Sequence, residues 1–223
     1  MDRIPLRERA LPDYTPGEER LNMVTHLVGA VISLPILICG LVLSAKHANP
    51  WAVVGCCIYG ASLLLLYTMS SLYHGLPDGM GKRVLRVIDH CTIYLLIAGT
   101  YTPILLVSIR PDHPALAWTM LGLEWVLGLT AAVLTAIDLQ KYSKVSMACY
   151  IAMGWLIVFA LKPTIEAVGL TGFLWLLAGG VAYTVGAVLY GIGKKRRYFH
   201  GVFHVFVLLG SVLQAVCILL YVL

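Results

Sequence analysis

Long apolar runs constrain the fold of this chain more than any other feature of its sequence. A transmembrane helix needs about 20 consecutive, mostly apolar residues. Only 12% of the 223 residues are charged, against about 25% in ordinary soluble domains. We therefore expect an all-α integral membrane protein, folded as a bundle of seven transmembrane helices. The expected spans cover residues of about 24–45, 51–73, 87–109, 115–137, 145–161, 170–192 and 202–222.

The chain before the first apolar run is polar. It carries Arg3, Arg7, Arg9 and Arg20, and it lacks the apolar segment and small-residue cleavage site that mark a secretory signal. We expect residues 1–23 to form a cytosolic N-terminal tail and residues 24–223 to form the transmembrane domain. The loops between the spans are short, so the sequence leaves no room for a separate soluble domain.

Basic residues are divided unequally between the two sets of connections. Thirteen of the 16 Lys and Arg residues lie in the N-terminal tail and in loops 74–86, 138–144 and 193–200. The positive-inside rule assigns this set to the cytosol, with the N-terminus inside and the C-terminus outside a cell's inner (plasma) membrane. Anionic lipid headgroups then explain the net charge of +5. We expect membrane lipid as a partner and no nucleic acid, and the sequence leaves the oligomeric state open.

Three histidines lie at the cytosolic ends of the predicted spans. His74 ends the second span, whereas His200 and His204 open the seventh and share one helix face because they are four residues apart. Three neutral imidazoles with an open fourth position are typical of catalytic zinc sites. We therefore predict Zn²⁺ at these histidines. Asp89, early in the third span, is then expected to act as general base or to orient a ligand. Ser70, one turn before His74, is expected to hold water or a substrate carbonyl.

Four motifs together resemble those of a known family. They are Glu18-Glu19-x-x-Asn22-x-x-Thr25-His26, Ser70-x-x-x-His74, Asp89-His90-x-x-Ile93-Tyr94-x-x-Ile97-Ala98-Gly99-Thr100-Tyr101-Thr102-Pro103 and Phe199-His200-x-x-Phe203-His204. From about Glu18 to the C-terminus, the chain resembles the bacterial hemolysin III family, a branch of the progestin and adipoQ receptor (PAQR) group. That group is part of the CREST superfamily of seven-span proteins, proposed metal hydrolases that include the alkaline ceramidases.

The resemblance carries its own expectations for the site and the activity. It implies zinc at His74, His200 and His204, with Ser70 and Asp89 touching the metal through water. It also implies a cytoplasmic N-terminus, in agreement with the count of basic residues. The family's name implies membrane lysis, whereas the superfamily implies hydrolysis of a lipid amide.

Two further groups of polar residues have more than one interpretation. Glu19, Asn22 and His26 recur at helical spacing, so they form either a polar stripe under the metal site or an interfacial cluster that caps the first helix. Glu124 lies about nine residues into the fourth span, near the middle of the bilayer. A carboxyl group there is expected to be neutral and hydrogen-bonded to a neighbouring helix, with Gln214 as the candidate partner. The alternative is that Glu124 lines a lipid cavity or a proton path.

Two functions of different classes remain from the sequence. The first is a zinc-dependent hydrolase that cleaves a lipid amide or ester at the cytosolic leaflet, as a ceramidase-like amidase does, or a protein that senses the state of membrane lipid. The second is a non-enzymatic, receptor-like protein of membrane homeostasis, or a lytic factor, in which zinc only holds helices together. An aqueous pore through one copy is disfavoured, because the first, second, fifth and sixth predicted spans contain no Asp, Glu, Lys or Arg.

Overall fold

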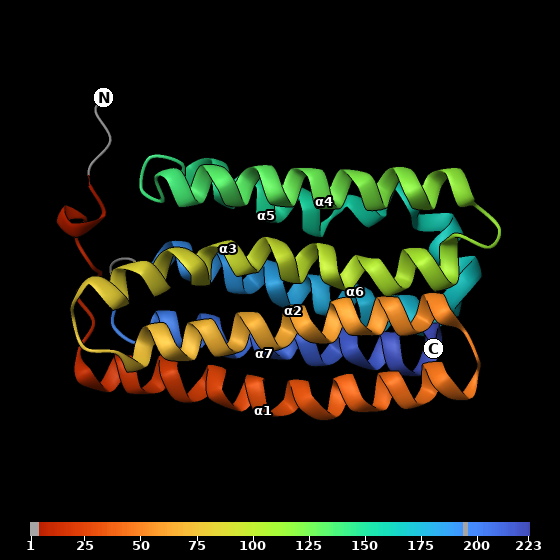
Figure 1. Cartoon of the computed structure of the whole chain (residues 1–223), viewed down its shortest axis with the longest axis horizontal. Coiled ribbons are helices and arrows are strands. Elements are labelled where there is room, and N and C mark those ends of the chain that lie inside the picture. Colours follow the sequence, from red (N-terminus) through yellow and green to blue (C-terminus); the bar gives the residue numbers. More distant parts are fainter. Residues whose placement is uncertain (1–4, 194–195) are drawn as a thin grey trace.

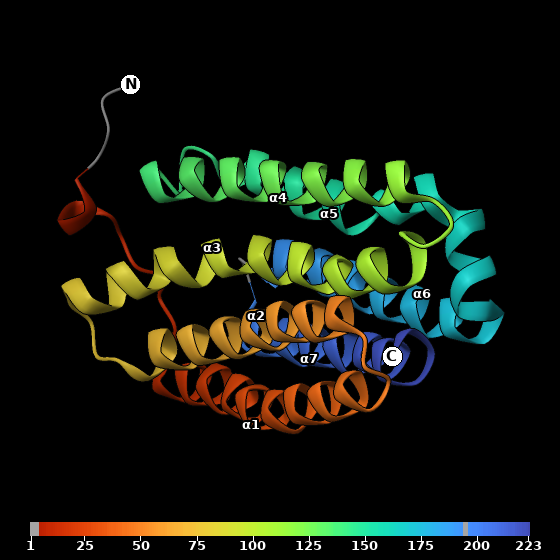
Figure 2. The same cartoon turned by 45° about the vertical axis from the view of Figure 1, so that its right-hand side comes forward.

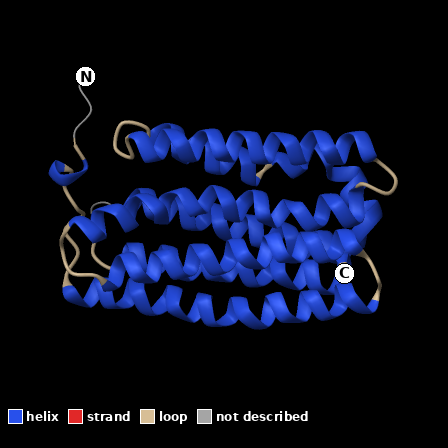
Figure 3. Ribbon diagram, in the orientation of Figure 1, coloured by secondary structure: helices blue, strands red, loops and turns tan. Residues whose placement is uncertain are grey.

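The computed structural model describes residues 5–193 and 196–223, so Arg3, Lys194 and Lys195 of the basic-residue count lie outside the described residues. The described chain consists of helices joined by loops (Figure 3). The helices are η1 (Leu6–Glu8), α1 (Pro16–Lys46), α2 (Pro50–Gly75), α3 (Met80–Pro103), η2 (Ile104–Ile109), α4 (Pro114–Ile137), α5 (Ser143–Gly154), η3 (Leu156–Ala160), α6 (Leu161–Gly193), α7 (Phe199–Cys217) and η4 (Ile218–Val222).

The long helices lie alongside one another in an elongated bundle. Helix α1 packs on α2, α2 on α3 and α3 on α4, so these four cross the view of Figure 1 in order. Helix α7 packs on both α1 and α6, and α4 and α5 keep their place on the side farthest from α1 when the bundle is turned (Figure 2). Helix α2 ends at the same end of the bundle where α1, α3 and α7 begin (Figure 1).

The outer surface of the bundle is apolar. Val31, Val126, Phe159 and Leu220 are each at least 60% exposed, whereas the interior is filled by side chains such as Tyr67, which is 1% exposed. A water-soluble protein would not present so many large apolar side chains outward, whereas bilayer hydrocarbon favours them. The surface therefore agrees with the prediction of an integral membrane protein.

Six stretches of helix are long and apolar enough to cross a membrane, so seven separate spans are not confirmed. The expected spans 145–161 and 170–192 fall within one continuous stretch, Ser143–Gly193, of 51 residues. Helix α5 has 12 residues, about 18 Å at 1.5 Å per residue, which is short of a bilayer's hydrocarbon core of about 30 Å. Within α6 the backbone leaves helical geometry at Gly169, with φ 70° and ψ 165°.

Several helices begin before the apolar runs that predicted them. Helix α1 begins at Pro16 because Thr15 caps it. The Thr15 hydroxyl accepts a hydrogen bond from the backbone N–H of Glu18, and the Glu18 carboxylate accepts one from the backbone N–H of Thr15. Residues 16–23 of the expected tail therefore form the first turns of α1. This extension carries Glu19 and Asn22 along the same helix as His26.

Candidate metal centre

Three histidine side chains converge at one end of the bundle. His74 comes from the last turn of α2, and His200 and His204 come from the first turns of α7. Each offers a ring nitrogen, and these three atoms lie within 4.8 Å of one another. The Nε2 atoms of His200 and His204 are 3.1 Å apart. The predicted ligands are thus brought together, although His74 and His200 lie 126 positions apart in the sequence.

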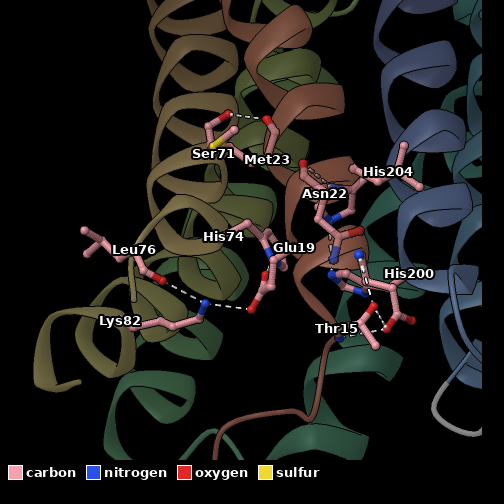
Figure 4. A network of polar contacts seen from close by, with 12 residues as sticks. Thr15, Glu19, Asn22, Met23, Ser71, His74, Leu76, Lys82, His200 and His204 are labelled. Carbon is pink, nitrogen blue, oxygen red and sulfur yellow. Dashed lines mark hydrogen bonds and ion pairs between the residues drawn. The ribbon is translucent and has the colours of Figure 1, made fainter. Parts of the chain in front are cut away.

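A carboxylate orients His74 toward the other two histidines. The Nδ1–H of His74 donates to the carboxylate of Glu19 at 2.6 Å, and the same carboxylate receives the ammonium of Lys82 at 2.6 Å (Figure 4). Lys82 also donates to the carbonyl oxygen of Leu76 at 2.9 Å. The Nε2 of His74 is buried without a hydrogen-bond partner among the described residues. Its lone pair is therefore free for a metal ion, as in many protein metal sites where a carboxylate holds the ligand's other nitrogen.

The backbone of α1 orients His204 in the same way. The Nδ1–H of His204 donates to the carbonyl oxygen of Asn22 at 3.2 Å, which leaves Nε2 to face His200. This contact requires α7 to approach α1 closely. A Cβ atom on Gly201 would lie 2.5 Å from Leu21 and 3.1 Å from the side-chain oxygen of Asn22, so any larger residue would require the Leu21 side chain to shift. The imidazole of His26 stacks on that of His204 with ring centres 3.6 Å apart.

The donor set fits a metal ion. Three imidazole nitrogens, two of them with the second ring nitrogen already hydrogen-bonded, suit a transition metal and do not suit Mg²⁺ or Ca²⁺, which prefer oxygen. Without an ion, Nε2 of His74 has no partner and Nε2 of His200 faces Nε2 of His204. Buried polar atoms without a partner are rare in proteins. The grouping of these nitrogens is therefore compatible with a metal site.

Asp89 and Ser70 lie beside the histidines. Both line one cavity together with His26, His200 and His204. The Ser70 side chain is fully buried, and its hydroxyl interacts with the Asp89 carboxylate. The Asp89 carboxylate, from the third turn of α3, interacts electrostatically with His74. The structure thus gathers all five residues singled out from the histidine motifs at one end of the bundle.

Comparison with known proteins identifies the relatives of this chain. The family model described as haemolysin-III related matches residues 14–215, which include every residue of the site described above. The chain belongs to the haemolysin III family. It is a multi-pass membrane protein, as the six apolar stretches of helix indicate.

Individual relatives extend over nearly the whole chain. Hemolysin-3 of Bacillus cereus is 41% identical over 206 residues, which are 92% of this chain and 92% of that protein. The Hemolysin-3 homolog of Bacillus subtilis (strain 168) is 38% identical over 208 residues, 93% of this chain and 96% of the relative. The monocyte to macrophage differentiation factor of Homo sapiens is 27% identical over 215 residues, 92% of this chain and 84% of that protein, a distant similarity that agrees with the PAQR group.

Two haemolysin III residues of the site were not predicted from the sequence. Lys82 binds the carboxylate that holds His74, and Tyr14 stacks over His200 with ring centres 5.1 Å apart. Burial raises the pKa of the Tyr14 phenol well above its ordinary value, so this ring covers the histidines as a neutral group. No motif spacing relates either residue to the histidines. In the sequence, Lys82 is one of the basic residues of loop 74–86, and Tyr14 is part of the polar N-terminal tail.

The polar stripe predicted on α1 contacts the histidines directly. Glu19 holds His74, the carbonyl of Asn22 holds His204, and His26 stacks on His204. The helix cap, which was the alternative role, belongs instead to Thr15 and Glu18. The reason is local geometry: a cap needs the residue before the helix and the one at its third position, whereas Glu19 is one position farther on and points toward α2.

Glu124 lies apart from the metal centre. It is fully buried on α4, and neither carboxylate oxygen has a hydrogen-bond partner among the described residues. The expected hydrogen bond to Gln214 is therefore absent. Helix α4 packs on α3 and α5, whereas α7 packs on α1 and α6, so the two side chains belong to different helix interfaces. Gln214 instead contacts Gly179 of α6.

Changing Glu19 to glutamine is expected to weaken metal binding about 10- to 100-fold, the usual effect of losing a residue that orients a metal ligand. An amide is a weaker acceptor for His74 Nδ1–H than a carboxylate, and it leaves the ammonium of Lys82 without its nearest counter-charge. Competition with a chelator of known affinity measures the change. Glu166→Gln alters an exposed glutamate of α6 and should have no effect. Equal affinities of Glu19→Gln and wild type would contradict the orienting role.

Proposed function

We propose that this haemolysin III protein crosses the plasma membrane seven times, with its N-terminus in the cytosol. The stretch Ser143–Gly193 has 51 residues, about 77 Å of helix at 1.5 Å per residue, which is enough to cross a 30 Å hydrocarbon core twice. Its helical geometry breaks at Gly169. Helix α1 begins at one end of the bundle and η4 ends at the other (Figure 1), as an odd number of crossings requires. The excess of basic residues at the α1 end supports a cytosolic orientation.

We also propose that it is a zinc-dependent hydrolase of a lipid amide or ester at the cytosolic leaflet. The observation that carries this proposal is that three imidazoles converge beside a cavity that is lined by the Ser70 hydroxyl and the Asp89 carboxylate. Zinc bound by three histidines supplies a water with a pKa of about 7 and polarises a carbonyl. Zinc is preferred among the metals that imidazole binds because three-histidine sites with an open position are typical of it.

The chain's own residues then have defined roles in hydrolysis. The Asp89 carboxylate accepts a proton as the oxygen of water bonds to the carbonyl carbon of the substrate. When the C–N or C–O bond breaks, Asp89 returns that proton to the leaving amine or alcohol, so the reaction consumes one water and leaves Asp89 unchanged. The Ser70 hydroxyl, which lies beside the Asp89 carboxylate, donates a hydrogen bond to the substrate carbonyl or to the water and orients it.

The shape of the cavity supports a lipid substrate. Its volume is about 190 Å³, far more than the 10–15 Å³ that one water needs. Beyond the histidines it continues between α3, α5, α6 and α7, where its walls are largely hydrocarbon: Ile97, Ile104, Ile157, Phe173, Leu176 and Val207. An apolar pocket with a few polar groups at one end favours a ligand of the same pattern. A lipid with its amide or ester at the histidines and its chain in the apolar part fits this description.

The test is release of fatty acid by purified protein in phosphatidylcholine vesicles. An N-acyl sphingosine and a fatty acyl ester serve as substrates, and mass spectrometry measures the free fatty acid. Wild-type protein loaded with one zinc per chain should release fatty acid from at least one of them, and the His200→Ala/His204→Ala double variant should release none above background. A wild-type protein that holds zinc and releases no fatty acid from either lipid would contradict the proposal.

A non-enzymatic role is the second candidate, and one observation favours it. The histidines join the end of α2 to the beginning of α7, so a metal there would clamp helices that are far apart in sequence, and a structural metal contributes directly to folding energy. In such a receptor-like or lytic protein, metal removal would destabilise the fold without any turnover to lose. The name Hemolysin-3 carried by the Bacillus cereus relative fits a lytic role. The fatty acid assay separates these possibilities.

A further inference from the structure

Gln214 places an amide deep in the apolar part of the cavity. It lies on α7, ten residues after His204, about 15 Å farther along the helix at 1.5 Å per residue. Its side chain extends over Gly179 of α6, where a Cβ atom would lie 2.5 Å from Cγ of Gln214 and 3.2 Å from its Cδ. Glycine at position 179 therefore makes the space that the glutamine occupies. Gln214 and His204 line the same cavity.

The hydrogen-bonding capacity of this amide is not used by the protein. Gln214 is half-buried, and no hydrogen bond of its side chain is found among the described residues. Neighbouring polar groups of the cavity are committed: the Tyr183 hydroxyl is 2.6 Å from that of Ser211, and the Thr184 hydroxyl donates to Gly180 and accepts from Trp155. An amide in an apolar, membrane-embedded site is unfavourable unless something pairs with it.

The chemistry of the amide selects one kind of partner. A glutamine side chain offers a carbonyl oxygen that accepts and an NH₂ group that donates. A hydroxyl group both donates and accepts, so it can satisfy the two together, whereas a ketone or ether oxygen satisfies only the NH₂. The walls around Gln214 include Leu176 and Val207, which suit hydrocarbon on either side of such a group.

We propose that Gln214 is a specificity-determining residue that binds a hydroxyl group near the middle of a fatty acyl chain whose carboxyl end lies at the histidines. The preferred ligands are thus mid-chain hydroxylated fatty acids and the lipids that carry them. This inference rests on the proposed function, because it requires the acyl chain to occupy the cavity. Gln214 would distinguish hydroxylated from unsubstituted acyl chains, which the metal centre alone would not do.

The experiment compares two fatty acids on the full-length, zinc-loaded protein in detergent. Stearic acid and a mid-chain hydroxystearic acid are titrated, and the shift in thermal unfolding temperature gives the apparent affinity of each. Wild type should bind the hydroxylated acid about three- to tenfold more tightly than stearic acid, the range expected for one neutral hydrogen bond. Gln214→Leu keeps a similar volume and should bind stearic acid at least as well as wild type, with the preference for the hydroxylated acid abolished or reversed.

A matched control removes a different polar group from the same cavity. Thr184→Val deletes a hydroxyl that already has partners within the protein, so it should leave the preference intact. If wild type and Gln214→Leu bind stearic acid but show the same ratio between the two acids, the role of Gln214 is overturned and the lipid cavity stands. If wild type binds neither acid, both the inference and the proposed lipid function fail.

Discussion

Replacing His204 with alanine is expected to abolish stoichiometric metal binding and to lower thermal stability. His204 supplies one of three converging nitrogens, and its Nε2 lies 3.1 Å from that of His200. The two remaining imidazoles are too few to hold the ion, since catalytic zinc sites in proteins use three protein ligands. An ion that binds only the folded state stabilises it by about 2.7 kcal/mol at a hundredfold excess over its dissociation constant, so this contribution is lost.

Metal content by mass spectrometry and thermal unfolding with and without a chelator test this prediction. Wild type should contain about one metal per chain, as one mononuclear site requires, and should lose stability when the chelator is added. His204→Ala should contain none and should not respond to the chelator. His113→Ala, which alters a histidine at the start of α4, serves as the control and should behave as wild type does. Wild-type protein that purifies without metal and is unaffected by chelator and added zinc would contradict the metal centre.

Replacing Asp89 with asparagine should leave the metal in place and reduce hydrolysis about 10²- to 10⁴-fold, the usual contribution of a general base. The variant keeps the size of the side chain and its position in the cavity beside Ser70 and His200. It removes the carboxylate that takes up the proton of the attacking water in the proposed hydrolysis. The rate of fatty acid release in vesicles and the metal content of the same sample measure the two effects.

The two readouts separate the possible roles of Asp89. Metal loss in Asp89→Asn would make the carboxylate a direct ligand and would contradict the assignment as base. Retention of both metal and full activity would exclude a catalytic role. Ser70→Ala provides a comparison, because a residue that only orients the reactants should change the rate less than the base does. It should also leave the pH dependence of the reaction unchanged, whereas removal of the base should alter it.

The sequence was most informative where the property is local. Length of apolar runs predicted the long helices because a membrane span depends on consecutive residues. The spacing of His200 and His204 predicted a shared face because the helical repeat places residues four apart together. The sequence was less informative about the two spans predicted within Ser143–Gly193. Helix α5 is too short to cross a bilayer by itself, and the helical stretch continues nearly unbroken through η3 to Gly169.

The sequence by itself determined that this is a membrane protein of long helices, and it predicted three histidines as metal ligands without showing which side chains would surround them. Only the tertiary structure decided which side chains serve those histidines: Glu19 with Lys82 holds His74, the Asn22 carbonyl holds His204, and Glu124 meets no partner in Gln214. These contacts join α1 to α2 and α7, and their existence depends on helix packing. Helical periodicity defines faces within one helix, whereas the neighbour of each face is chosen by packing between helices distant in sequence.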